Sequence, residues 1–240
     1  RNSTKQTELP PHHTPKWQPA SMTNTQHSCP AGRGLGPRMP DREGLAYRPD
    51  QFLTHHLPNG QNQGDGWRGY TIGAAPDSSN QTELCIVRLP EGKGTGYLFE
   101  SASVGSDVMT KEPAGVFTLP EGPLQKDIVM ICTGTGVAPF RAMLQDRLEK
   151  ETVNFHLIFG CRTAEDLLYR EEFEAMARSH SNFTYSVAVT RAEIEATNEM
   201  RTTKSYVHPV SEVKHAAIRT TVRLHLCPRA CSLDSAHARV

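Results

Sequence analysis

A strand-like run, a glycine-rich turn and the start of a helix follow one another between residues 127 and 140. The apolar run 128–132 predicts a buried parallel strand. It ends at the turn 133–136, Thr-Gly-Thr-Gly, and Pro139 falls near the first turn of the predicted helix, where a missing amide costs little. This geometry binds phosphate, because glycine lets the backbone approach closely, and the free amides and the helix dipole favour negative charge.

The turn matches no complete nucleotide motif by itself. Its glycines lack the spacing of the dinucleotide fingerprint, and the lysine of a Walker loop is missing. An ordinary β–α turn that needs glycine for its backbone dihedral angles is therefore an open alternative.

Residues 68–71, Arg-Gly-Tyr-Thr, could serve one ligand from a single strand. An arginine pairs a phosphate through two hydrogen bonds, a tyrosine offers a flat face, and a hydroxyl reaches a ring nitrogen. Farther along, the segment 92–96, Gly-Lys-Gly-Thr-Gly, could place amides and a hydroxyl on a second phosphate. A half-exposed strand and a flexible hairpin turn are the structural alternatives for these two segments.

Composition bounds the class of protein. The 240 residues allow one or two domains with a real core. The 26 basic and 26 acidic residues balance, so bulk charge indicates neither nucleic acid nor an anionic membrane as a partner. No apolar run reaches the length of a membrane span, and no signal peptide is recognisable in the polar, proline-rich N-terminal region. The six scattered cysteines do not look like a disulfide framework, so we expect a reduced, cytoplasmic protein.

Three zones follow one another along the chain. Residues 1–44 lack a periodic apolar pattern and are expected to form a disordered or irregular tail. Residues 45–120 alternate short β-prone runs with turn-rich joints, which predicts a small antiparallel β-barrel or sandwich. Residues 121–240 alternate strands with helices, which predicts a doubly wound α/β domain around a parallel sheet. The predicted elements are strands at 51–57, 83–89 and 116–119 in the barrel, strands at 128–132, 154–160, 183–189, 204–207 and 222–227 in the second domain, and helices at 139–149 and 165–178.

The order of these motifs resembles that of the ferredoxin–NADP reductase superfamily, flavoenzymes in which a flavin-binding barrel precedes a nicotinamide-binding α/β domain. Residues 68–71 match the family's Arg-x-Tyr-Ser/Thr flavin motif, and residues 133–140 match its Gly-Thr-Gly-x-x-Pro-Phe nucleotide loop. Residues 47–52 are similar to its Pro-Gly-Gln-Phe barrel entry, although Asp50 replaces the usual glycine. The segments that complete the series are 92–95, 113–117 and 159–172.

The resemblance implies a role for each matching residue. Arg68 would pair with the flavin pyrophosphate, Tyr70 would lie against the flavin, and Thr71 would hydrogen-bond near the flavin N5 atom that accepts hydride. The loop of Gly94 and Thr95 would hold a phosphate. The residues implied for the nicotinamide nucleotide are Thr133, Gly134, Thr135, Gly136, Pro139 and Arg162.

The region after the third strand of the second domain bears on the choice between NADPH and NADH. Arg191, Lys204 and Tyr206 look like the Ser-Arg…Lys-x-Tyr pattern of family members that use NADP. There the arginine and lysine meet the adenosine 2′-phosphate and the tyrosine stacks on adenine. Two cations converging on an extra phosphate also satisfy electrostatics. Solvated surface cations are the alternative, and Arg201 could substitute for either.

Both ends of the chain match the family less well. The family has a strand that ends in Cys-Gly, with the cysteine near the nicotinamide; Cys227 arrives at a suitable distance along the chain, but Pro228 replaces the glycine. Thr71 and Cys227 are thus the candidate catalytic residues. Residues 1–44 supply no recognisable first strands, so the barrel is expected to be incomplete, with exposed strand edges.

These observations favour a flavoprotein oxidoreductase that carries FAD, takes hydride from NADPH and passes electrons to a carrier such as ferredoxin or flavodoxin, or to a fused redox domain. A truncated family member that binds nucleotide without catalysis is the second hypothesis. A zinc-binding interaction module is a remote third, because His225, Cys227, Cys231 and His237 have an irregular spacing for zinc. No metal site is therefore expected.

Overall fold

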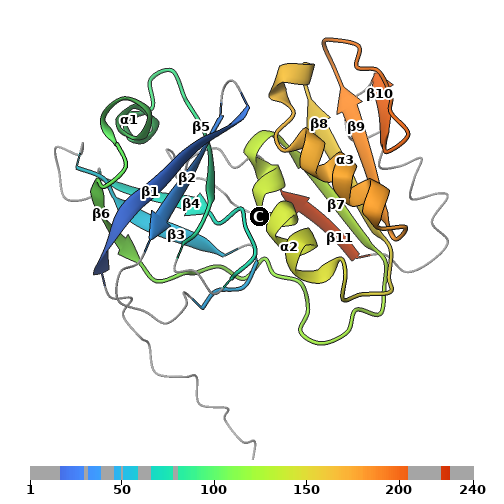
Figure 1. The fold of residues 1–240 in the computed structure, drawn as a ribbon, viewed down its shortest axis with the longest axis horizontal. Helices are drawn as coiled ribbons and strands as arrows, with labels where there is room; N and C mark the ends of the chain where they lie inside the picture. The colour runs from blue at the N-terminus through green and yellow to red at the C-terminus, as the bar shows by residue number, and fades with distance from the viewer. Residues whose placement is uncertain are drawn as a thin grey trace, which may run out of the picture.

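The computed structural model describes residues 17–29, 32–38, 46–49, 51–58, 66–77, 81–204 and 223–227. These residues form two sheets that lie side by side, an antiparallel one built from the first part of the chain and a parallel one built from the second part (Figure 1). The fold therefore has the two parts, barrel and α/β domain, that the sequence predicts.

The described strands of the first sheet follow the order β4-β3-β6-β1-β2-β5, with every pair antiparallel. A bridge between Ile72, directly after β4, and Leu84 in β5 joins the two ends, so the sheet closes on itself as a barrel. Side chains alternate between the inside and the outside, as in β3, where Leu53 and His55 are buried. The strands are β1 (Trp17–Cys29), β2 (Gly32–Arg38), β3 (Phe52–His56), β4 (Trp67–Thr71), β5 (Leu84–Val87) and β6 (Asp107–Lys111).

The first two strands correct the expectation of an irregular tail over residues 1–44 and of an incomplete barrel. Strand β1 pairs with both β2 and β6, and its Ala20 and Met22 are buried in the barrel core. These strands have few large aliphatic side chains, so their alternation is weak in the sequence. The two strands pair with each other, but their other partners, β6 and β5, lie far along the chain, and no local pattern reveals those partners.

Two other parts of the barrel differ from the prediction. The segment 92–96 is helical, with α1 (Lys93–Gly96) continuing into the π-helix η1 (Tyr97–Ser101). The strand predicted at 116–119 is wrong: these residues form no strand and Val116 is 97% exposed. Ala114, just before them, forms an isolated bridge to Phe52 of β3. This part of the chain runs between the two sheets, so its apolar residues do not belong to a ladder.

The second sheet follows the order β10-β9-β8-β7-β11, and all its pairs are parallel. The order runs outward from β7 in one direction and then places β11 on the other side of β7, which is the reversal that marks a doubly wound sheet. The strands are β7 (Ile128–Thr133), β8 (Phe155–Cys161), β9 (Phe183–Val189), β10 (Met200–Lys204) and β11 (Arg223–Cys227). The sequence predicts a strand at 204–207, but β10 ends at Lys204 and so lies earlier in the chain. Strand β9 has the predicted bounds.

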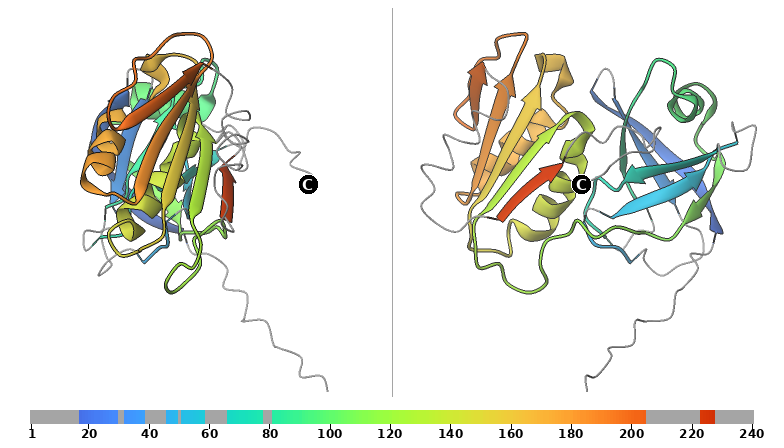
Figure 2. Two further views of the ribbon diagram at one scale, coloured as in Figure 1. Left: turned by 90° about the vertical axis from the view of Figure 1, so that its right-hand side faces the viewer. Right: turned by 180° about the vertical axis from the view of Figure 1, so that it is seen from behind.

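Helices α2 (Ala138–Arg147) and α3 (Arg170–Ser179) cover the same face of this sheet (Figures 1 and 2). Residues buried on that face include Met130, Phe159 and Tyr185, whereas Val129 and Ile158 are buried on the opposite face. Burial on both faces explains why these strands read as continuous apolar runs. The predicted second helix is split, because the short 3-10 helix η3 (Ala164–Asp166) precedes α3.

Three cysteines within the described residues, Cys85, Cys132 and Cys161, are buried, and none of the three is part of a disulfide. Burial, together with the nearby charge of Asp166, raises the pKa of Cys161 to about 11, so its thiol stays protonated at neutral pH.

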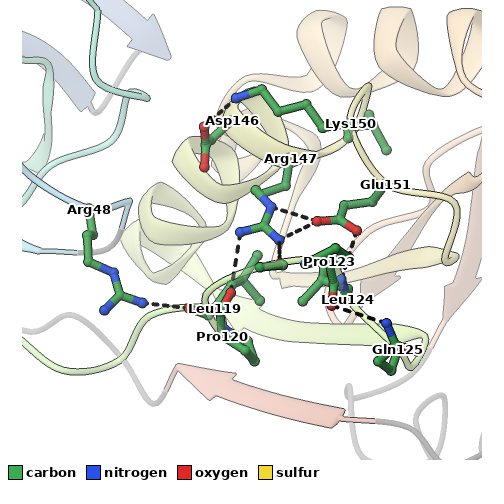
Figure 3. Close-up of polar contacts among 12 residues, drawn as sticks. Arg48, Leu119, Pro120, Pro123, Leu124, Gln125, Asp146, Arg147, Lys150 and Glu151 are labelled. Atoms are coloured by element: carbon green, nitrogen blue, oxygen red, sulfur yellow. Dashed lines mark hydrogen bonds and ion pairs between the residues drawn. The ribbon is translucent and has the colours of Figure 1, made fainter.

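The segment that joins the two sheets is held from both sides (Figure 3). Arg48, from the barrel half, donates to the carbonyl of Leu119 at 2.7 Å, and Arg147 of α2 donates to the carbonyl of Pro120 at 3.3 Å and to that of Gly122. Glu151 accepts from Arg147 and from the backbone amide of Leu124. We call this group the linker clamp.

Candidate functional site

Arg68 and Tyr70 of β4 meet the α1 segment at Gly94. A Cβ atom on Gly94 would lie 3.0 Å from the Cγ atom of Arg68 and 3.1 Å from the hydroxyl oxygen of Tyr70, closer than ordinary contact. The alternation of the strand puts both side chains on one face, and the missing side chain of Gly94 lets the α1 backbone approach them. The structure thus brings two predicted flavin motifs together.

Thr95 has a different position from the one that a direct phosphate ligand would need. Its side chain is buried, and its hydroxyl contacts the backbone amide of Leu89 at 3.2 Å and the carbonyl of Gly92 at 3.2 Å. A Cβ atom on Gly92 would lie 2.5 Å from this hydroxyl. Thr95 therefore shapes the loop from inside, and its role as a phosphate ligand stays a prediction.

The nucleotide turn has the geometry that the sequence predicts for anion binding. Thr133 ends β7 in an extended conformation, and the 3-10 helix η2 (Gly134–Val137) leads directly into α2, with Pro139 in the first turn. Gly134 has a φ of +54°, which favours glycine, and a Cβ atom there would meet nothing within 4 Å. The Thr133 side chain makes no hydrogen bond that caps this turn.

The turn lies at the carboxyl end of β7, where the strand order reverses between β8 and β11. In open α/β sheets ligands bind at this switch point. The same turn contacts β8 and the barrel strand β5. Gly73, two residues after Thr71, packs against Ala138 at the start of α2, since a Cβ atom on Gly73 would lie 3.4 Å from that of Ala138. The end of β4 and the start of α2 are therefore neighbours.

Arg141 of α2 connects the two domains at this contact. Its guanidinium donates to the carbonyl of Gly73 at 2.6 Å, to Glu83 at 2.9 Å and to Glu172 at 2.7 Å. Burial acts to lower the pKa of Arg141, but the two carboxylates outweigh it, so the pKa is raised and the charge is kept. Neither Arg141 nor Glu83 belongs to a recognisable motif, so the sequence alone does not mark them as site residues.

Three cations lie at the carboxyl ends of adjacent strands of the parallel sheet. The amide of Arg191 donates to the carbonyl of Arg162 at 2.9 Å, which places the loops after β9 and β8 together. Lys204 ends β10 opposite Val189 of β9. Both predicted 2′-phosphate residues are exposed, and Lys204 donates to Glu193 at 2.9 Å. Tyr206, the third member of the pattern, lies outside the described residues.

Strand β11 brings Cys227 into register with Cys132, one residue before Thr133. The backbone of the predicted catalytic cysteine thus lies beside the strand that leads into the nucleotide turn, and its catalytic role stays a prediction. Of the proposed zinc ligands, Cys231 and His237 lie outside the described residues, as does Asp50 of the barrel entry. Within the described ranges, no group of three or more His, Cys, Asp or Glu residues is placed to hold a metal ion.

Comparisons with known proteins agree with this geometry. Residues 37–119 match the Oxidoreductase FAD-binding domain family, and residues 130–227 match the Oxidoreductase NAD-binding domain family. The chain is 31% identical over 173 residues to ferredoxin–NADP reductase B of Sorangium cellulosum, an alignment that covers 72% of this chain and 69% of that protein. It is 31% identical over 149 residues to the anthranilate 1,2-dioxygenase electron transfer component of Acinetobacter baylyi, covering 62% and 42% of the two chains.

Solved structures share the fold. A ferredoxin NADP+ reductase from Neisseria gonorrhoeae with bound FAD and NADP superposes with a TM-score of 0.68 at 22% identity, covering 87% of this chain and 84% of that one. The Amycolatopsis cytochrome P450 reductase GcoB superposes with a TM-score of 0.71 at 22% identity, covering 88% and 61%.

The chain belongs to the ferredoxin–NADP reductase superfamily and carries an FAD-binding and an NAD-binding domain. The family resemblance, the fold class, the flavin oxidoreductase class and the two cofactors are thereby confirmed. The chain spans less than half of the anthranilate dioxygenase component that it matches. The described residues include no helix that combines the length and the apolar character needed to cross a membrane.

Proposed function

We propose that this protein takes hydride from NADPH onto bound FAD and passes the electrons one at a time to a carrier protein. The observation that supports this most is the contact of Gly94 with Arg68 and Tyr70 on β4, because Gly73, just after this strand, packs against Ala138, which directly follows the turn Gly134–Val137. FAD, when bound, accepts two electrons together and releases them singly.

In this proposal the residues of the chain bind and orient the cofactors. The Arg68 guanidinium holds the flavin phosphates, Tyr70 lies against the flavin, and the Thr71 hydroxyl donates a hydrogen bond to it. The backbone amides of Gly134, Thr135 and Gly136 hold the pyrophosphate of the nicotinamide nucleotide. Because the cofactors supply the redox chemistry, no acid–base pair is needed.

The preference for NADPH over NADH is supported by Arg162, Arg191 and Lys204, whose strand ends adjoin. An added 2′-phosphate would find three cations there. Glu193 weakens this preference, because its carboxylate already pairs with Lys204. The hydrogen bond from Lys204 and its charge lower the pKa of the Glu193 carboxyl.

The carrier protein is proposed from the names of relatives, which describe a ferredoxin–NADP reductase and an electron transfer component of a dioxygenase. Ferredoxin, flavodoxin and a fused redox domain all remain possible acceptors. A cytoplasmic location stays a prediction of the sequence. The hypothesis of a chain that binds nucleotide without flavin depended on an incomplete barrel, and the closed six-stranded sheet removes that ground.

The proposal is tested by titrating the purified protein with FAD and then adding NADPH or NADH. We expect bound flavin with absorption bands in the near-ultraviolet and blue, rapid bleaching by NADPH, and a higher KM for NADH. Arg191→Ala should raise the KM for NADPH about tenfold and leave that for NADH within about twofold, because only NADPH carries the extra phosphate. Protein that binds no FAD would contradict the flavin part of the proposal. Equal KM values for NADPH and NADH, in both the wild type and Arg191→Ala, would contradict the preference for NADPH.

A further inference from the structure

Five side chains form a polar cluster between the barrel and α2. We call it the interface cluster and define it as Arg141, Glu83, Glu172, Tyr169 and Gln145. Glu83 precedes barrel strand β5, Arg141 and Gln145 lie on α2, and Glu172 lies on α3, with Tyr169 directly before it. The cluster therefore joins elements of both domains at the contact between Gly73 and Ala138.

Arg141 is the centre of this cluster. Its side chain is 11% exposed, whereas those of Glu83 and Glu172 are 32% and 30% exposed. The Nη1 atom of Arg141 donates to the backbone carbonyl of Gly73. The carbonyl oxygen belongs to the backbone, so it cannot move away by a rotamer change. The bond therefore sets the separation of two backbones, the exit of β4 and the first turns of α2. Thr71 is two residues from one end of it, and Pro139 is two residues from the other.

Tyr169 supports the same arginine at a conformational cost. It has a φ of +57°, in the left-handed region that a tyrosine rarely adopts. In this conformation its ring lies under the guanidinium of Arg141, with 4.4 Å between the Cζ atom and the ring centroid. Its hydroxyl donates to Glu83 at 3.0 Å. Backbone strain persists only where surrounding contacts fix the residue. The strained Tyr169 therefore indicates that its contacts hold Arg141 in one position.

Gln145 extends the cluster to a second backbone group of the barrel. Its Oε1 atom accepts the amide of Ala75 at 2.9 Å, and its Nε2 atom donates to Glu172 at 2.8 Å. Glu172 thus links the two α2 side chains that reach across to the barrel. A change at Arg141 is expected to loosen the Ala75 bond through this carboxylate.

We propose that Arg141 is a positioning residue for hydride transfer, which fixes the end of β4 with Thr71 against the turn of Gly134 and Gly136. This inference rests on the proposed function. Paired charges of this kind contribute little net stability compared with well-packed apolar side chains, but they do fix geometry. Hydride transfer depends steeply on geometry, since a small displacement of reacting groups costs a large part of the rate.

The first test uses the whole chain without added cofactor and follows amide hydrogen exchange by NMR. The Ala75 amide bonds across the interface, whereas the Phe52 amide bonds to Ala114 within the barrel. In Arg141→Met we expect exchange at Ala75 to rise at least about tenfold and exchange at Phe52 to stay within about twofold. If Arg141→Met does not fold, Glu83→Gln decides: it keeps the shape, removes the charge and should raise exchange at Ala75 by about threefold.

Arg147→Met is the matched control, because Arg147 is also a largely buried arginine on α2 but belongs to the linker clamp. It should leave exchange at Ala75 within about twofold. Unchanged exchange at Ala75 in Arg141→Met, an equal rise at Phe52, or an equal rise at Ala75 in Arg147→Met would each overturn the positioning role.

The second test uses the FAD-loaded enzyme. Arg141→Met should retain FAD and keep its KM for NADPH within about twofold, while flavin reduction at saturating NADPH slows at least about tenfold. Arg141→Lys should recover part of the rate, and Arg147→Met should match the wild type. An unchanged reduction rate in Arg141→Met overturns the inference. If neither nucleotide reduces the wild-type flavin, the proposed function fails, and amide exchange alone decides whether Arg141 positions the two backbones.

Discussion

At the scale of residues, the proposed flavin site depends on Gly94, which has no side chain. Arg68 and Tyr70 lie so close to Gly94 that a Cβ atom at this position would force the arginine or the tyrosine to shift. Gly96, in the same short helix, has open space around the corresponding position. The two glycines therefore form a natural comparison.

We predict that Gly94→Ala weakens FAD binding about tenfold, because the added methyl displaces Arg68 or Tyr70. Gly96→Ala should change the affinity by no more than about twofold, since its methyl meets nothing within 4 Å. A titration of flavin fluorescence against protein measures both dissociation constants. Equal affinities for the two variants would show that the Gly94 contact is not part of the flavin site.

At the scale of elements, β1 determines whether the barrel is complete. It lies between β6 and β2 in the sheet, so without it β2 and β5 would lose their connection to β6 and its neighbours on that side. Ala20 faces the core opposite Val108, and Pro19 is exposed opposite Met109. The two neighbouring positions thus report on opposite faces of one strand.

Ala20→Lys should destabilise the barrel by about 3 kcal/mol or more, because it places a charge in an apolar core. Pro19→Lys should change stability by less than about 0.5 kcal/mol, as expected for an exposed position. Urea unfolding followed by tryptophan fluorescence measures this, since both tryptophans of the chain, Trp17 and Trp67, lie on barrel strands. Similar stabilities for both variants would mean that residues 17–29 do not form the strand described here.

At the scale of the whole molecule, His55 couples global stability to pH. It is 1% exposed in the barrel core, and its Nδ1 atom contacts the hydroxyl of Thr110 at 2.8 Å. Burial lowers the pKa of His55 from its usual value of 6.5 to about 4. Between these two values the unfolded chain binds a proton that the folded chain does not, so stability falls as the pH decreases from 6.5 towards 4.

We expect this histidine to remove about 3 kcal/mol of unfolding free energy over that interval, with no further loss from it below pH 4. His55→Gln has no titrating ring, and the other groups titrate alike in both proteins. The difference between the two stability profiles, measured by urea unfolding from pH 4 to pH 7, therefore isolates His55. Parallel profiles would contradict the shift in its pKa.

The sequence alone determined the elements whose signals are local. The apolar run of β7, the glycines of η2 and Pro139 follow one another directly, so backbone chemistry predicts their strand, turn and helix without knowledge of the rest of the chain. Arg68 and Tyr70 lie at alternate positions of one short strand, so the sequence also predicts that they could serve one ligand. Their flavin role is implied only by the resemblance and stays a prediction, and their contact with Gly94 is seen only in the tertiary structure.

Only the tertiary structure decided what depends on distant partners. Strands β1 and β2 are too polar to show a clear alternation. Besides pairing with each other, they obtain hydrogen bonds from the distant strands β6 and β5. Arg141 and Glu83 are 58 positions apart and belong to no motif, so no local pattern connects them. Arg141 and Glu83 meet because one domain packs on the other. The same packing sets the separation between β4 and the turn η2.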